Sequence, residues 1–160
     1  MSKWLMGTQT FPKFDSFHGH CAITVDFKDT SCLDAYNTIK DNMIYWNPEP
    51  KAGGAYSIWT ALEVESIWGV RTSAKKSKYD ILFEIFANDV NDFTKKGCKI
   101  ASKSRTQALS MPWGDTSNYC NMWNVLNEIE GPTGKSLIDQ IEVTECAAKP
   151  KNPAVDCTKA

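Results

Sequence analysis

The six cysteines are the feature that most constrains the fold of this chain of 160 residues. They are spread over most of the sequence and form neither a C-x-x-C pair nor a Cys/His cluster with zinc-site spacing. Widely spaced cysteines in even number favour disulfide bonds over a metal site, and six of them allow fifteen connectivities. We therefore expect a chain stapled by disulfides among Cys21, Cys32, Cys98, Cys120, Cys146 and Cys157.

Disulfides persist in oxidising compartments, so the cysteines predict an extracellular protein or one of the secretory-pathway lumen. Trp4-Leu5-Met6 is too short to be the apolar core of a signal peptide, so we expect the leader to have been removed already. No apolar run approaches the roughly 18 residues that a transmembrane helix requires, and no membrane insertion is expected.

Composition and charge are those of an ordinary globular domain. Apolar residues make up 42 % of the chain and charged residues 23 %, with a net charge of −1. Nucleic-acid binding depends on an excess of Lys and Arg, which this chain lacks, so nucleic acid is not expected as a partner. We expect a single domain over residues 1–146 that begins with an irregular strap (1–20), and a tail over 147–160 tethered by Cys157.

The first half of the chain alternates between strand and helix patterns. Residues 21–27 place apolar side chains at every second position, which predicts a half-buried strand. Residues 29–31 offer N-cap side chains for a helix that continues to about residue 43. Residues 56–68 form the longest strand candidate, and 79–86 predict its hairpin partner. Residues 69–78 are polar and typical of a turn between them.

The second half repeats these signals. Residues 98–109 alternate lysines with small and apolar side chains. This pattern predicts an edge strand whose charged side chains discourage pairing with another chain. Residues 115–117 supply cap chemistry for a second helix with apolar side chains at helical spacing. Residues 137–146 predict a final strand, with an uncapped helix as the alternative. Together these elements predict an α+β fold with an antiparallel sheet of four to five strands and two helices packed on one face.

The segment from Tyr79 to Phe93 resembles the strand and following helix of ferredoxin-like dimeric α/β-barrel proteins. The resemblance extends from Cys21 to Asn88, contains no diagnostic motif, and does not account for the cysteines. It implies a ferredoxin-like arrangement, a homodimer, and a small enzyme that works by acid–base chemistry.

The most suggestive short motif is His18-Gly-His20. Two imidazoles at this spacing are weak candidates for metal ligands, because the sequence specifies no third ligand. Either histidine is also a candidate acid–base group with a carboxylate such as Glu63 or Glu84. A glutamate that faced inward from a strand would have a raised pKa, although the alternation around Glu63 points it toward solvent.

The six tryptophans are the strongest compositional oddity. Several lie in or beside loops and strand ends rather than in helices, where an aromatic side chain can contact a ligand. The candidate ligand-binding residues are Trp46, Trp59, Trp68, Trp113 and Tyr56.

These observations favour a secreted, disulfide-stabilised binding module whose partner is a small apolar or aromatic molecule or a glycan. No cofactor is predicted, and a bound organic ligand or pigment fits the aromatic content. The first alternative is the acid–base enzyme that uses His18 or His20. The second is a structural or interaction protein without a pocket.

Overall fold

A computed structural model describes residues 10–110 and 115–159, which contain a six-stranded antiparallel sheet and three α-helices. The α+β class and the stapling by disulfides are confirmed, but the prediction of four to five strands is wrong. The strands are β1 His20–Ser31, β2 Ala55–Leu62, β3 Ser66–Thr72, β4 Lys78–Ala87, β5 Lys96–Thr106 and β6 Gln140–Cys146. The helices are α1 Cys32–Tyr45, α2 Ser117–Leu126 and the short α3 Pro153–Asp156, which the 3₁₀ turn Cys157–Lys159 follows.

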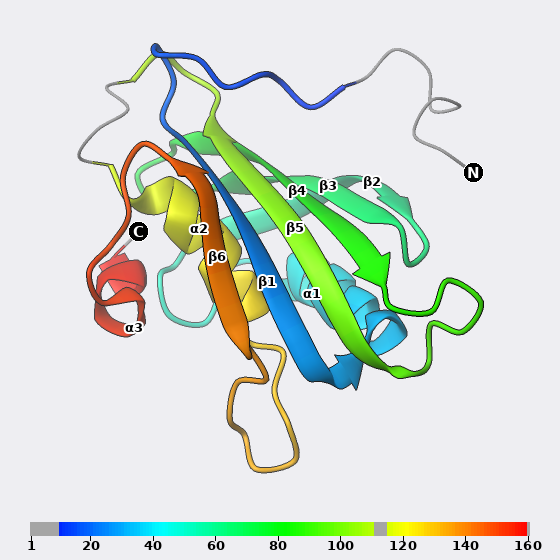
Figure 1. Cartoon of the computed structure of the whole chain (residues 1–160). Coiled ribbons are helices and arrows are strands. Elements are labelled where there is room, and N and C mark those ends of the chain that lie inside the picture. Colours follow the sequence, from blue (N-terminus) through cyan, green and yellow to red (C-terminus); the bar gives the residue numbers. More distant parts are fainter. Residues whose placement is uncertain (1–9, 111–114, 160) are drawn as a thin grey trace.

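The strand order across the sheet is β2-β3-β4-β5-β1-β6 (Figure 1). The chain from β2 to β5 is a meander, and α1 carries the chain from β1 to β2 across the three strands that lie between them. In a split β-α-β unit of the ferredoxin-like type, a single strand lies between the two strands that the helix joins. The topology therefore departs from the ferredoxin-like arrangement.

One face of the sheet packs against the helices, and Figure 1 shows α1 and α2 behind it. Alternate residues of each strand point to this face because the side-chain period of a strand is two. Val25 of β1 pairs with Ile100 of β5, which pairs with Ile85 of β4, and all three are buried. Ile39 of α1 and Met122 of α2 belong to the same buried cluster.

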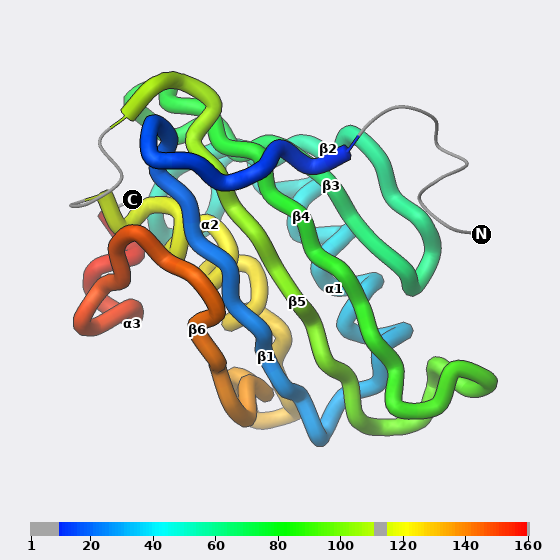
Figure 2. The backbone as a smooth tube through the Cα atoms, turned by 45° about the horizontal axis from the view of Figure 1, so that its top comes forward, coloured from blue at the N-terminus to red at the C-terminus, as the bar shows by residue number. Residues whose placement is uncertain are grey.

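The opposite face carries most of the charged side chains of the sheet. Lys99, Lys103 and Arg105 of β5 alternate with buried residues and point to this face. Residues 10–19 form no strand or helix and cross this face near one end of the strands, as Figure 2 shows. The ring of Phe11 lies 5.6 Å from that of Trp68 on β3.

The predicted long strand over residues 56–68 is wrong. The chain reverses after Leu62, where the amide of Glu65 donates to the carbonyl of Leu62 and Val64 has a positive φ of 53°. Two strands, β2 and β3, replace one. The predicted turn over residues 69–78 is correspondingly too long, because β3 continues to Thr72.

The predicted edge strand over residues 98–109 is also wrong, because β5 lies between β4 and β1. The lysines of β5 lie on the face of the sheet that is exposed to solvent, and they do not mark an edge strand. Alternating charged residues in a strand indicate that one of its faces is exposed to solvent. A central strand of an antiparallel sheet can have such a face just as an edge strand can.

Three disulfides connect the six cysteines. Cys21–Cys146 joins β1 to β6, Cys32–Cys98 joins the start of α1 to β5, and Cys120–Cys157 joins α2 to the 3₁₀ turn near the C-terminus. None of the helices that the structure describes is long and apolar enough to cross a membrane.

Candidate functional site

The aromatic residues predicted to bind a ligand do not form one pocket. Trp46 and Tyr56 pack edge to face on the helix side of the sheet, with ring centroids 5.6 Å apart. Trp59 and Trp68 pack edge to face on the opposite side, with centroids 4.6 Å apart. Trp113 lies outside the described residues. The sheet itself therefore separates the candidates into two sets.

Of the first set, Trp46 lines a cleft between the loop that follows α1 and the side of α2. We call it the Trp46 cleft, and its volume is about 10 Å³. Two indoles and two small apolar side chains contribute its apolar surface, while amides and charged groups contribute the rest. Its lining consists of Trp46, Glu49, Pro50, Lys51, Ala52, Trp123, Asn124, Asn127 and Glu128.

Glu49 is the buried member of this lining, with 3 % of the residue exposed. Its Oε1 atom accepts from the amide of Gly54 at 3.0 Å, from Nε of Arg71 at 2.9 Å and from Nη2 of Arg71. Its Oε2 atom is buried and has no hydrogen-bond partner. The donors from Gly54 and Arg71 named above therefore converge on Oε1.

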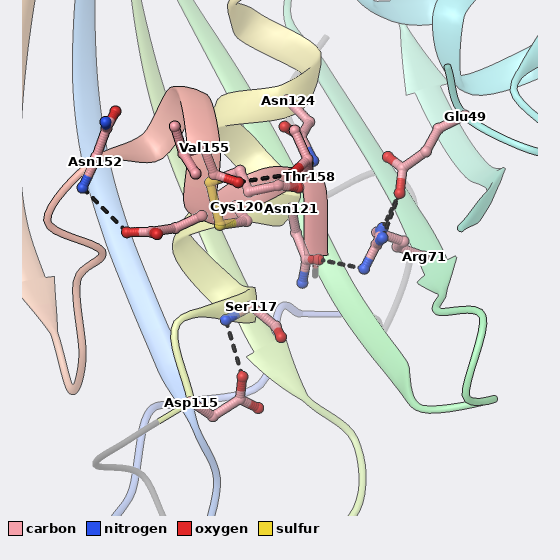
Figure 3. The surroundings of a disulfide bond; sticks show 12 residues. Glu49, Arg71, Asp115, Ser117, Cys120, Asn121, Asn124, Asn152, Val155 and Thr158 are labelled. Carbon is pink, nitrogen blue, oxygen red and sulfur yellow. Dashed lines mark hydrogen bonds and ion pairs between the residues drawn. A yellow bond between two sulfur atoms is a disulfide. The ribbon is translucent and has the colours of Figure 1, made fainter. Parts of the chain in front are cut away.

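Arg71 is completely buried and faces Glu49 from β3, as Figure 3 shows. Its guanidinium also donates to Oδ1 of Asn121 on α2 at 3.0 Å and lies over the ring of Tyr56. The Tyr56 hydroxyl donates to the backbone carbonyl of Asn121 at 3.0 Å. Burial and, to a lesser extent, the Glu49 carboxylate raise the pKa of Tyr56 well above its usual value.

The loop between α1 and β2 holds Glu49 in place through its own backbone. The amide of Glu49 donates to the carbonyl of Gly54, and the amide of Tyr56 donates to the carbonyl of Trp46. A Cβ atom on Gly54 would lie 2.6 Å from Nη2 of Arg71, so glycine is needed for the guanidinium to approach this loop. The loop and the ion pair therefore fix one another.

At the rim of the Trp46 cleft, Lys51 Nζ lies 3.7 Å from Glu128 Oε1. Burial is the main cause that raises the pKa of Glu128, and a hydrogen bond with Glu130 adds to it. The four charged groups around the cleft, Glu49 with Arg71 and Lys51 with Glu128, thus cancel in pairs.

On the other face of the sheet, Trp59 is 51 % exposed and Trp68 only 8 %. Trp59 sits where the β2–β3 register shifts, beside Trp68 across the strand pair. The indole nitrogen of Trp68 is buried without a hydrogen-bond partner. This pair forms an aromatic platform rather than a pocket.

His18 lies beside a carboxylate, but not beside the glutamates proposed from the sequence. Its Nδ1 atom is 2.8 Å from Oδ1 of Asp15 and 3.0 Å from Nη2 of Arg105. In one tautomer Nδ1 donates to Asp15, and in the other it accepts from Arg105. The hydrogen bond with His18, then that with the Phe17 amide, lowers the pKa of Asp15 to about 2. This geometry is that of a histidine oriented by a carboxylate.

His20 has other neighbours than the Asp15 carboxylate that His18 contacts. Its Nδ1 atom contacts the carbonyl of His18 at 2.9 Å, and its Nε2 atom lies 3.8 Å from Oε2 of Glu145 on β6. The ring of Phe14 stacks on it, with centroids 4.5 Å apart. The two imidazoles therefore have different neighbours, Asp15 for one and Glu145 for the other.

Glu63 and Glu84 are not brought to the histidines. Glu63 is exposed in the turn between β2 and β3 and is not on a strand. Glu84 pairs with Ala101 on β5, whereas His20 pairs with Arg105, four residues further along that strand. Four residues of strand span about 13 Å, beyond hydrogen-bond reach. Within residues 10–110 and 115–159, no group of three or more His, Cys, Asp or Glu side chains could hold a metal ion.

The sequence reasoning missed Glu49, Arg71, Asn121 and Trp123. Glu49 lies between the predicted helix that ends near residue 43 and the predicted strand from residue 56, and Arg71 lies in the predicted turn over residues 69–78. A signal for Arg71 was present, since Ile67, Gly69 and Arg71 alternate on the buried face of β3. A charged residue at such a position requires a buried partner of opposite charge.

No family model matches this chain, and no curated protein matches its sequence. The functional proposal below therefore depends on the geometry of this chain alone.

Proposed function

We propose that this protein is an extracellular binding module that holds a small aromatic or apolar molecule in the Trp46 cleft. The observation that carries the proposal is a concave site with the indoles of Trp46 and Trp123 in its lining and one buried carboxylate, Glu49. Small-molecule sites typically combine apolar and aromatic walls with a few fixed polar groups.

The size of the cleft limits the ligand. Its volume is about 10 Å³, which is room for about one water molecule and far below the roughly 300–1,000 Å³ of most ligand pockets. Such a shallow cleft can receive the edge of a single aromatic ring and is too small to enclose a pigment with an extended ring system. The three disulfides support an extracellular location, because such bonds persist in oxidising compartments.

The proposal is tested by NMR titration of the nitrogen-labelled protein with phenethyl alcohol, a neutral single-ring probe. We expect the indole N–H signals of Trp46 and Trp123 to shift together with the side-chain amides of Asn124 and Asn127. The indole signal of Trp59 lies on the other face of the sheet and should not move. W123L should weaken binding at least about ten-fold, since it removes one aromatic wall.

W59L is the matched control, because it removes an indole outside the cleft and should bind the probe like the wild type. Equal affinity of W123L and wild type would refute the site, as would shifts confined to Trp59 and Trp68.

A glycan on the other face is the second candidate ligand. The half-exposed Trp59 ring, supported edge-on by Trp68, is a flat apolar surface of the kind that stacks on a sugar. A glycan-array screen of the wild type and W59A tests it. Signals that W59A loses and W123L keeps would favour this face, and identical signals from wild type and W59A would exclude it.

A further inference from the structure

We infer that a second cleft of this protein binds a small uncharged molecule with neighbouring hydroxyl groups, a monosaccharide or another polyol. The cleft lies at the end of the sheet where β1 ends and where β5 and β6 begin (Figure 1). We call it the Asn88 cleft, and it is lined by residues 26–28 of β1, residues 96–98 of β5, Asn88 and Asp139. It shares no residue with the Trp46 cleft, so the inference does not rest on the proposed function.

The size of the Asn88 cleft suits one small molecule. Its volume is about 300 Å³, at the lower end of the roughly 300–1,000 Å³ of most ligand pockets. The side chains of Asp26 and Asp139 are 42 % and 38 % exposed, and those of Lys28 and Lys96 are exposed as well. A ligand can therefore reach the charged groups of the lining from solvent.

A break in the pairing of β1 with β5 lies at this cleft. The pairing passes from Phe27–Cys98 to Ser31–Lys96. Residues 28–30 of β1 therefore lie opposite Gly97 alone. A bulge leaves its extra residues unpaired and bends the strand, and bulges often lie next to functional sites.

Covalent and backbone contacts hold the walls of the Asn88 cleft in place. Cys98 is bonded to Cys32 at the start of α1. The amide of Asp139 donates to the carbonyl of Asp26 at 2.8 Å, which holds the chain before β6 against β1. The site is therefore preorganised, and a ligand loses little of its binding free energy in ordering it.

Two polar groups of the lining are free to bind a ligand in place of water. A Cβ atom on Gly97 would lie 2.4 Å from Nδ2 of Asn88, so the Asn88 amide lies directly against the backbone of Gly97. Gly97 also has a φ of 107°, which favours glycine. Within residues 10–110 and 115–159, neither the Asn88 amide nor the Lys96 ammonium forms a hydrogen bond or ion pair with another side chain.

The charges of the lining favour a neutral ligand. Asp26 and Asp139 contribute two negative charges, and Lys28 and Lys96 contribute two positive charges, so the lining has no net charge. Nζ of Lys28 lies 3.2 Å from Oδ1 of Asp139, and Nζ of Lys99 lies 3.8 Å from Oδ1 of Asp26. A charged ligand would compete with these ion pairs and would gain no excess of opposite charge.

Neighbouring hydroxyl groups match this arrangement of donors and acceptors. A carboxylate only accepts hydrogen bonds and an ammonium only donates them, whereas a hydroxyl does both. Two adjacent hydroxyls can therefore bind Asp139 and Lys28 side by side, and the Asn88 amide can donate to or accept from a third. An apolar molecule would instead remove water from these groups without replacing its hydrogen bonds.

The inference is tested by NMR titration of the nitrogen-labelled wild-type protein with probes that share a ring of one size. In mildly acidic buffer glucose is neutral, glucosamine is a cation and glucuronate is an anion, while cyclohexanol has a single hydroxyl. We expect glucose to shift the side-chain amide of Asn88 and the backbone amides of Lys28 and Gly97. It should bind at least about five-fold more tightly than cyclohexanol, and within about three-fold of the two charged sugars.

The contrary results are distinct from one another. Unmoved signals of Asn88 and Gly97 with glucose, or equal binding of glucose and cyclohexanol, would overturn the inference. A preference of about ten-fold or more for either charged sugar would overturn the selection of a neutral ligand. Shifts confined to the Trp59 indole would overturn the Asn88 cleft in favour of the aromatic platform. The proposed function is judged separately, by the indole signals of Trp46 and Trp123.

A variant checks one of the acceptors. D139N keeps the size of the side chain and removes its charge, so glucose binding should weaken by about three- to ten-fold, because charge-assisted hydrogen bonds are the stronger ones. E142Q is the matched control, since it removes a negative charge from an exposed position of β6 outside the cleft. Equal affinities of D139N and E142Q for glucose would contradict the site. The comparison of probes on the wild type decides the question even where D139N does not fold.

Discussion

At the scale of single residues, the Arg71–Glu49 pair is the most consequential feature of the core. Both groups are buried, and removal of one would leave the other charge without a partner in a low dielectric. We expect R71M to lower the free energy of unfolding by about 3–5 kcal/mol, measured by urea denaturation.

The matched variant is R71M/E49L, in which both charges are replaced by apolar side chains. Since the isolated carboxylate is then gone, the double variant should be more stable than R71M alone. A double variant less stable than R71M would show that the unpaired Glu49 carboxylate is not what destabilises R71M.

A second prediction concerns Asp15, which lies beside His18 and Arg105. Its pKa is lowered from 3.8 to about 2, so the folded state binds a proton there less readily than the unfolded state. The stabilisation by Asp15 is therefore fully present above pH 4 and is lost as the pH falls through about 2. The difference in urea midpoint between wild type and D15N should shrink over this range.

An independent measurement is the titration of the Asp15 carboxyl by NMR, with a midpoint expected at about 2. A midpoint at the ordinary value of 3.8, or a D15N difference that does not change with pH, would refute the contact with His18.

Single residues also show where the sequence stops being informative. Four of the six Trp and both His were candidates, and His18 does lie beside a carboxylate. That carboxylate is Asp15, three residues away, because the irregular strap turns back on itself there. Glu49 and Trp123 meet only through the packing of a loop against α2, which no local pattern encodes.

At the scale of elements, α1 and α2 differ in whether a side chain caps their first turn. The hydroxyl of Ser31 accepts from the amide of Asp34 at the start of α1, whereas Thr116 makes no side-chain cap bond at the start of α2. We expect S31A to cost about 1 kcal/mol of unfolding free energy. T116A, the control, should change it by less than about 0.5 kcal/mol.

Thermal denaturation of both variants measures this difference. A loss of equal size for S31A and T116A would show that the cap bond at Ser31 contributes nothing beyond the propensity of the substituted residue.

Local patterns identified most elements and misjudged how strands pair. The strand at residues 79–86 and the helix after Ser31 were found because their periodicity is local. The reversal at Val64 was missed, since no Gly, Pro or Asn marks it. The position of β5 in the sheet was misjudged, because the alternation of its lysines describes one wet face and not its neighbours.

At the scale of the whole molecule, the sequence predicted disulfides but not their pairing. Pairing depends on which elements the topology brings within about 4.4–6.8 Å between Cα atoms. Cys32 and Cys98, for example, are 66 residues apart and meet because β1 pairs with β5 just before α1 begins. The six-stranded order that creates this meeting depends on long-range pairing.

The three disulfides divide between the body of the fold and its C-terminal end. Cys21–Cys146 closes a separation of 125 residues and ties β6, an edge strand with mostly exposed side chains, to β1. Cys120–Cys157 closes only 37 residues and ties the terminal turn to α2, where Asn124 also donates to the carbonyl of Cys157. Chain entropy alone makes the longer bridge worth about 1 kcal/mol more.

We therefore expect C21A/C146A to lower the midpoint of global unfolding more than C120A/C157A does, in urea denaturation of the two double variants. C120A/C157A should instead act locally. A protease should cut it between residues 147 and 159 faster than the wild type, while hydrogen exchange in β1, β4 and β5 stays slow because those strands keep their pairing. Rapid exchange throughout the sheet of C120A/C157A, with no faster cutting of the tail, would mean that the terminal turn is part of the cooperative core.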